Sequence, residues 1–262
     1  MAVLSLVLRQ RTDRDAQPNS RFRAAVFCLN LDVSTHMTHF KLFFSTLLFF
    51  TLSGCTQQAS NLADTYSLLY KGFPDAQYSQ EEIQALPYAS IYARLGDGPR
   101  GFLVLAYAEP FSHNQTALKW MSADSEVIET VSGRIVKTLK LPGTNLAKLD
   151  SDTPDPLALG LLNPTTPANW QFRIDFVPGY HFGYNASSTF ENKGADQVAI
   201  NGIMRDAVFF EETVTISALN HTYTNQYWLA PTSGKVLKTI QYPAPNMDAI
   251  SISFLKAYQG AQ

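Results

Sequence analysis

From Tyr88 to Phe254 the chain is a succession of short apolar runs, many with alternating polar residues, punctuated by glycine and proline. A two-residue period places successive side chains on opposite faces of an extended strand, so these runs predict β-strands. We expect strands over residues 90–95, 102–108, 116–121, 127–131, 134–139, 170–177, 184–190, 197–200, 207–217, 222–229, 235–242 and 249–254. Their number and short connections favour a mainly β fold, an antiparallel barrel or sandwich.

Two short helices are predicted ahead of the strands. The first covers residues 60–71, where apolar side chains recur at helical spacing, and the second follows the capping-box pattern of Ser79 and Glu82 and stops at Pro87. Residues 141–169 contain five prolines. We therefore expect a long surface crossing there, with one helical turn near residues 157–162.

A short motif near the N-terminal end predicts that the protein is located in the cell envelope. Lys41 and the apolar residues 42–51 precede Leu52-Ser53-Gly54-Cys55. This is the build of an export signal, and its apolar part is shorter than the ~20 residues that a membrane span requires. The four residues resemble a bacterial lipobox, so we expect Cys55 to be lipid-modified and inserted in the outer membrane, which Thr56 favours by analogy with enterobacterial sorting. The alternative is a buried amphipathic segment with Cys55 in a core.

The lipobox divides the chain into three parts. Residues 37–54 form the predicted signal peptide, and residues 55–262 form a single β-rich domain. We interpret residues 1–36 as a spurious extension upstream of an initiator at Met37, or alternatively as a disordered basic arm. From Cys55 onward, 14 Lys and Arg stand against 19 Asp and Glu, and no other cysteine remains. This charge does not favour nucleic-acid binding, and the domain must fold without a disulfide.

Several motifs could indicate a cofactor or a metal, but each has a simpler interpretation. The glycines of residues 96–101 match a dinucleotide fingerprint, yet a strand follows them where that site needs a helix, so we predict a hairpin turn. The acidic residues 150–155 lack the glycine and the twelfth-position acid of a calcium loop and are read as a solvated loop. The histidines have no metal-ligand spacing. We therefore expect no cofactor, no metal and no catalytic residues.

Glu211 and Glu212 are the remaining candidates for acid–base chemistry. The side chains of adjacent residues on a strand point to opposite faces, so one carboxylate can be buried while the other is exposed to water. A buried one would form an ion pair, for example with Arg173 or Arg205. A glycosidase instead needs two carboxyls facing one cleft.

One internal repeat aligns residues 132–139 with residues 233–240, without a gap. Each copy predicts a hairpin turn, with glycine at a positive φ, followed by a strand. Basic side chains in the two strands could form a stripe that contacts acidic sugars or a protein partner, and the preceding tryptophans could add to that surface. The candidate contacts are Trp120, Arg134, Lys137, Trp228, Lys235 and Lys238. The alternative is a set of solvated residues that prevents edge-to-edge pairing.

Four segments together resemble one family: the lipobox at Cys55, residues 86–91, residues 120–124 leading to 133–138, and residues 225–228 leading to 233–236. They are similar to the YjbF/GfcB lipoproteins of exopolysaccharide and group 4 capsule operons. The resemblance implies an outer-membrane lipoprotein that faces the periplasm and assists export or assembly of an extracellular polysaccharide. It implies as partners an outer-membrane β-barrel protein, the exopolysaccharide, or both, with no catalytic residues to carry over.

Two other functions stay open on the residues alone. One is a general envelope scaffold or β-barrel assembly lipoprotein, which would affect many outer-membrane proteins. The other is a carbohydrate-active enzyme, which would require paired acids such as Glu211 and Glu212 in a cleft.

Overall fold

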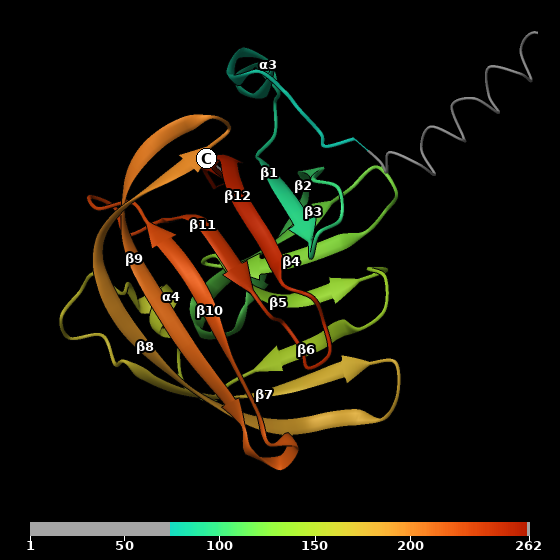
Figure 1. Cartoon of the computed structure of the whole chain (residues 1–262), viewed down its shortest axis with the longest axis vertical. Helices are drawn as coiled ribbons and strands as arrows, with labels where there is room; N and C mark the ends of the chain where they lie inside the picture. Colours follow the sequence, from blue (N-terminus) through green and yellow to red (C-terminus); the bar gives the residue numbers. More distant parts are fainter. Residues whose placement is uncertain (1–73, 261–262) are drawn as a thin grey trace, which may run out of the picture. The chain divides into compact units, whose positions relative to one another are not determined.

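The computed structural model describes residues 74–260, and these residues form a single twelve-stranded antiparallel sheet (Figure 1). The strands are β1 (Ser90–Leu95), β2 (Gly101–Phe111), β3 (Gln115–Met121), β4 (Val127–Val131), β5 (Arg134–Leu139), β6 (Asn145–Asp150), β7 (Asn169–Val177), β8 (His181–Ile200), β9 (Ile203–Ile216), β10 (His221–Leu229), β11 (Val236–Gln241) and β12 (Ile250–Lys256). The predicted mainly β class is confirmed, and of the two alternatives the sheet takes the form of a nearly closed barrel.

The order of the strands explains how the sheet curls on itself. It runs β5-β4-β3-β2-β1-β12-β11-β10-β9-β8-β7-β6, so strands that follow one another in sequence are hydrogen-bonded neighbours in the sheet, except β5 and β6. The first and last strands pair antiparallel, which brings the two ends of the described chain together. The two edge strands, β5 and β6, are joined by the short turn at residues 140–144 and lie side by side.

Side chains join β5 and β6 where no backbone ladder does. The backbone N–H of Leu146 donates to the Thr138 hydroxyl over 2.9 Å. The Asn145 side chain accepts from the N–H of Leu141 over 3.0 Å and donates to its carbonyl over 2.9 Å. These bonds satisfy backbone groups that an open sheet edge would leave unpaired.

Burial follows the strand period, as β7 illustrates. Trp170, Phe172, Ile174 and Phe176 are buried, while the residues between them are exposed or half-buried. Together with apolar side chains from the other strands, they form the main core inside the barrel. A second cluster centres on Tyr227 and Leu229 of β10.

The two predicted glycine hairpins are present. Gly133 between β4 and β5 has φ 96°, and Gly234 between β10 and β11 has φ 67°. Gly96 and Gly98 lie in the turn between β1 and β2, and Gly101 begins β2, so a strand follows as expected.

The second predicted helix is α3 (Gln80–Ala85), whose Ser79 cap forms both bonds of the capping box with Glu82. The first, at residues 60–71, lies outside the described residues, as does Cys55. Ahead of α3, Asp75 accepts hydrogen bonds from the Arg94 side chain and from the Arg100 backbone, which ties this segment to β1 and to the turn that leads into β2. No helix within residues 74–260 has the length and apolarity needed to cross a bilayer.

Two expectations about the strands were wrong. The crossing at residues 141–169 contains a full strand, β6, in addition to a helical turn, α4 (Pro156–Leu159). The runs at 184–190 and 197–200 belong to one long strand, β8, which pairs with β9 along its length and shifts register between Asn192 and Gly194. Beyond that bulge, Val198, Ile200 and Ala207 form a small separate cluster with Trp228 and its neighbours.

Candidate functional site

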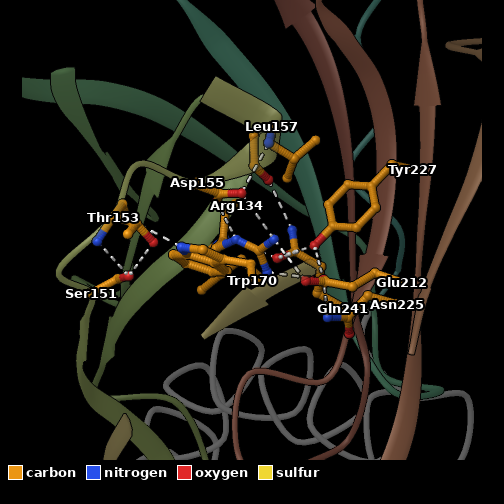
Figure 2. A network of polar contacts seen from close by, with 12 residues as sticks. Arg134, Ser151, Thr153, Asp155, Leu157, Trp170, Glu212, Asn225, Tyr227 and Gln241 are labelled. Atoms are coloured by element: carbon orange, nitrogen blue, oxygen red, sulfur yellow. Dashed lines mark hydrogen bonds and ion pairs between the residues drawn. The ribbon is translucent and has the colours of Figure 1, made fainter. Parts of the chain in front are cut away.

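A buried ion cluster occupies one part of the barrel interior (Figure 2). Arg134, the first residue of β5, donates through Nε and Nη2 to the Asp155 carboxylate, the latter bond being 3.2 Å long. Its Nη1 and Nη2 donate to the two Glu212 oxygens of β9 over 3.0 and 2.9 Å. All three side chains are at least nine-tenths buried. The guanidinium therefore bridges two carboxylates from distant parts of the chain.

Aromatic rings surround the same guanidinium. Its central carbon lies 4.7 Å from the centroid of the Trp170 ring. Three further rings have their centroids within 6 Å, those of Phe172, Phe190 and Tyr227. A cation that has lost its water gains electrostatic energy from aromatic faces, so these rings help to offset the cost of burying Arg134.

Neutral polar groups complete the network from β10 and β11. The Asn225 amide and the Tyr227 hydroxyl each donate to Glu212 over 3.0 Å. Gln241 accepts from the N–H of Ile135 over 3.0 Å and donates to the carbonyl of Gly133 over 2.8 Å. The turn that leads into Arg134 is therefore held by the opposite hairpin.

The two carboxyls have pKa values shifted in opposite directions. Burial raises the pKa of Asp155 above its ordinary 3.8, and the charge and hydrogen bonds of Arg134 only partly offset this. Burial acts on Glu212 too, but the charge of Arg134, with hydrogen bonds from Arg134 and Asn225, outweighs it and lowers that pKa below 4.5. Two carboxyls sharing one cation explain the difference, because only one of them is fully compensated.

The cluster also fixes a loop that reaches the outer surface. Asp155 caps α4 by accepting from the N–H of Leu157 over 2.9 Å. Just before it, the indole N–H of Trp170 donates to the Thr153 carbonyl over 3.2 Å, and the Ser151 hydroxyl donates to the Gln171 carbonyl over 2.7 Å. Hydrogen bonds thus fix residues 151–155 to β7 and, through Asp155, to the buried ion cluster. With its charges paired and buried, the cluster has the arrangement of a structural support and not of an acid–base site.

Two residues of the predicted contact surface lie in the interior. Trp120 is 1% exposed and donates from its indole to the Thr130 hydroxyl over 2.8 Å. Arg134 is 2% exposed. Neither is exposed to a partner, so the prediction of a contact at Trp120 and the assignment of Arg134 to a basic surface stripe were wrong. The reason is that Arg134 finds two carboxylates inside the barrel, whereas an unpaired arginine would stay in water.

The other predicted contacts lie at the surface, but they do not form one stripe. Lys137 and Lys235 are exposed. Trp228 is half-buried; its ring stacks on Phe209 and its indole donates to Asp196 over 2.8 Å. The Lys238 ammonium lies 5.5 Å from the Trp228 ring centroid. The structure thus brings Trp228 and Lys238 together, on the face away from the ion cluster.

Glu211 and Glu212 point to opposite faces of β9, as predicted. Glu212 is fully buried, whereas Glu211 is half-buried and pairs with Lys193 over 3.1 Å. The partner of the buried carboxylate is Arg134 instead of Arg173 or Arg205. Arg173 binds Asp150 and Asp152 on the surface. The two glutamates therefore do not face one cleft as a glycosidase pair must.

The prediction that Asp155 belongs to a solvated loop was wrong. The sequence does contain a signal for its role as a helix cap, because Asp followed by Pro156 is typical of an N-cap and first turn of a helix. Its burial depends on Arg134, which is 21 residues away in sequence. Within residues 74–260, no group of three or more His, Cys, Asp or Glu side chains could hold a metal ion.

Comparisons with known proteins place this barrel among bacterial lipoproteins. The family described as "Group 4 capsule polysaccharide lipoprotein gfcB, YjbF" matches residues 63–255. The uncharacterized lipoprotein GfcB of Escherichia coli (strain K12) is 31% identical over 206 residues, which are 78% of this chain and 93% of that protein. The uncharacterized lipoprotein YjbF of the same organism is 30% identical over 213 residues, 80% of this chain and 95% of the relative.

A solved structure agrees with the fold. The crystal structure of the hypothetical lipoprotein YmcC from Escherichia coli (K12) superposes with a TM-score of 0.60 at 29% identity. The match covers 74% of this chain and 95% of that one.

Proposed function

Because the chain belongs to the YjbF family of group 4 capsule polysaccharide lipoproteins, we propose that it is an outer-membrane lipoprotein that assists export or assembly of an extracellular polysaccharide without catalysing a reaction. In this proposal Cys55 carries the lipid and the barrel faces the periplasm. The supporting observation is the family match over residues 63–255, which includes nearly all of the described barrel.

The lipobox supplies the anchor in this proposal. Its cysteine directly follows small residues and an apolar run, and only one other cysteine, Cys28, occurs in the chain. A single acyl chain binds a membrane weakly, at about 0.8 kcal/mol per buried CH2, whereas a lipoprotein cysteine with several chains stays anchored. The domain would then act next to the membrane through which the polymer must pass.

A non-enzymatic role fits the ionisable groups of the barrel. Arg134, Asp155 and Glu212 are paired with one another and are buried. Glu211 lies on the other face of β9, paired with Lys193. A protein without a reactive site can still serve export by holding the polymer, or by docking to an outer-membrane β-barrel protein that conducts it.

The test is gene deletion followed by complementation. The deleted strain receives the wild-type gene, a Cys55→Ala variant or a Cys28→Ala variant, and polysaccharide is measured outside the cell and in the periplasm. We expect deletion to lower the extracellular polymer, and we expect the wild type and Cys28→Ala to restore it while Cys55→Ala does not. Membrane fractionation after labelling with palmitate should place the labelled protein in the outer membrane only when Cys55 is present.

Two results would contradict the proposal. Unchanged extracellular polymer in the deletion strain would remove the role in polysaccharide export. If the deletion instead lowered the amounts of many outer-membrane proteins, the chain would be a general envelope scaffold or assembly factor. Full rescue by Cys55→Ala would show that lipidation is dispensable for the function.

A further inference from the structure

An open groove of about 920 Å³ lies on the outer face of β7, β8 and β9. Its floor consists of outward side chains of these strands. One wall is the loop at residues 151–153 and the other includes Ser217 and Ala218 of η2 (Ser217–Leu219). This volume is at the upper end of the range of ligand-binding sites in proteins, so it could hold several sugar rings.

The floor is a regular array of amides and hydroxyls. Strand register places Gln171 opposite Ser187, and Ser187 opposite Thr215, while Arg173 is opposite Asn185. Gln171, Asn185 and Ser187 are exposed. Their donors and acceptors are therefore available to exchange water for ligand hydroxyls. An amide offers both a donor and an acceptor, which suits the vicinal hydroxyls of a sugar.

Aromatic side chains lie at one end of this array. Phe182 lines the groove and is 60% exposed, although a phenylalanine gains nothing from contact with water. Tyr180, in the turn that joins β7 to β8, is 96% exposed. An exposed aromatic face beside polar groups provides an apolar surface for the C–H face of a sugar ring.

The lining of the groove offers an acidic ligand no free cation. Arg173 is the cation of the lining, and both of its terminal nitrogens are already engaged. Nη2 donates to Asp150 over 2.8 Å and to Asp152 over 3.1 Å, and Nη1 donates to Asp152 over 3.2 Å. Asp150 is also paired with Lys148 over 3.5 Å, so the two carboxylates and two cations balance. A uronic acid bound there would find no free cation among the lining residues to balance its charge.

The groove wall is fixed before any ligand arrives. The Ser151 hydroxyl is bonded to the β7 backbone, Thr153 is bonded to Trp170, and Asp155 is held by Arg134 in the core. A site whose walls are already ordered loses less conformational entropy on binding.

We propose that this groove binds an uncharged segment of a polysaccharide, through the amides of Gln171 and Asn185 and the ring of Phe182. This inference rests on the proposed function, since it names the surface through which the lipoprotein holds the polymer. It also replaces Trp120 and Arg134, which are buried, with residues that a ligand can reach.

Binding is tested by affinity electrophoresis of the full chain, purified from envelopes in detergent. The gels contain the extracellular polysaccharide of the producing strain, the same polymer after chemical reduction of its carboxyl groups, or alginate as an acidic reference. We expect the strain's polymer to retard the wild-type protein, with retardation kept after carboxyl reduction and little changed between low and high salt. Alginate should not retard it.

Variants locate the site. The double variant Gln171→Ala/Asn185→Ala and the single variant Phe182→Ala should each weaken binding by roughly ten-fold or more. The matched control is Gln226→Ala, which removes a half-buried amide from β10, outside the groove lining, and should bind as the wild type does. Equal thermal unfolding midpoints of all four proteins would exclude a loss of folding as the cause.

The outcomes separate this inference from the proposed function. If the groove variants bind like the wild type, or no polymer retards the wild type, the groove assignment is wrong, even where gene deletion lowers the extracellular polymer. If carboxyl reduction abolishes binding, the ligand is an acidic segment and the assignment is again wrong. If deletion leaves the polymer unchanged, the proposed function fails, whatever the gels show. Loss of binding in both groove variants but not in Gln226→Ala supports the assignment.

Discussion

Gly133 lies so close to Val236 that a Cβ at residue 133 would be 2.7 Å from Val236 Cγ2. These residues belong to the two copies of the internal repeat, residues 132–139 and 233–240. The strands that follow the two turns, β5 and β11, are not neighbours in the sheet. The two hairpins therefore meet through packing, and the Gln241 side chain bonds them to each other through the Gly133 carbonyl.

A Gly133→Ala substitution should destabilise the protein by about 2–4 kcal/mol, because the added methyl overlaps Val236 and alanine is strained at φ 96°. Gly143→Ala is the matched control, since its φ is 73° and nothing lies within 4 Å of its added Cβ. It should destabilise the protein only through the strain of alanine at a positive φ, by about 1–2 kcal/mol. Urea unfolding measures both. Equal losses in the two variants would mean that the contact with Val236 relaxes freely.

Much of the fold could be predicted because most strands carry their own signal. The range 127–131 and the range 134–139 coincide with β4 and β5. Strand β6 was missed because its six residues lie among prolines and include Asn145, Lys148 and Asp150. Two strands were predicted in place of β8 because its middle, around residues 191–197, is polar and exposed. Backbone pairing with β9 keeps these residues in one continuous strand.

The ion cluster could not be predicted, for a different reason. In sequence, Arg134 opens a strand that also carries the exposed Lys137, so the two basic residues resemble each other. What distinguishes Arg134 is its pairing with Asp155 and Glu212, which lie 21 and 78 residues away. Only the closed curl of the sheet brings these carboxylates together, and no local pattern encodes that distance.

An Arg134→Met substitution should destabilise the protein by about 3–5 kcal/mol. Methionine preserves apolar volume but leaves Asp155 and Glu212 buried without their cation, which is the costly way to break such a cluster. Lys193→Met is the control, since Lys193 pairs with Glu191 and Glu211 at the surface. It should leave the urea midpoint unchanged. A small effect at Arg134 would mean that the cluster is hydrated.

Asp155 and Glu212 should give opposite dependences of stability on pH. The lowered pKa of Glu212 contributes stability that is present above pH 4.5 and is lost as pH falls through its folded value. The raised pKa of Asp155 contributes stability that is present below pH 3.8 and is lost as pH rises through its folded value.

The measurement is urea unfolding of the wild type, Glu212→Gln and Asp155→Asn from about pH 3 to about pH 7. The stability advantage of the wild type over Glu212→Gln should shrink toward acid. Its advantage over Asp155→Asn should shrink toward neutral pH. If the stability advantage of the wild type over the two variants changed in the same direction with pH, the opposite pKa shifts of Asp155 and Glu212 would be contradicted.

Two buried threonines offer a test of how the barrel closes. The Thr138 hydroxyl accepts the N–H of Leu146 where β5 meets β6, whereas the buried Thr239 hydroxyl has no hydrogen-bond partner among the described residues. Thr138→Val leaves a buried N–H unsatisfied and should cost about 1–3 kcal/mol. Thr239→Val has the same change of shape but removes an unpaired polar atom, so it should be neutral or stabilising. Hydrogen exchange at Leu146 should accelerate in the first variant alone. Slow exchange in both would mean that other contacts hold β5 against β6.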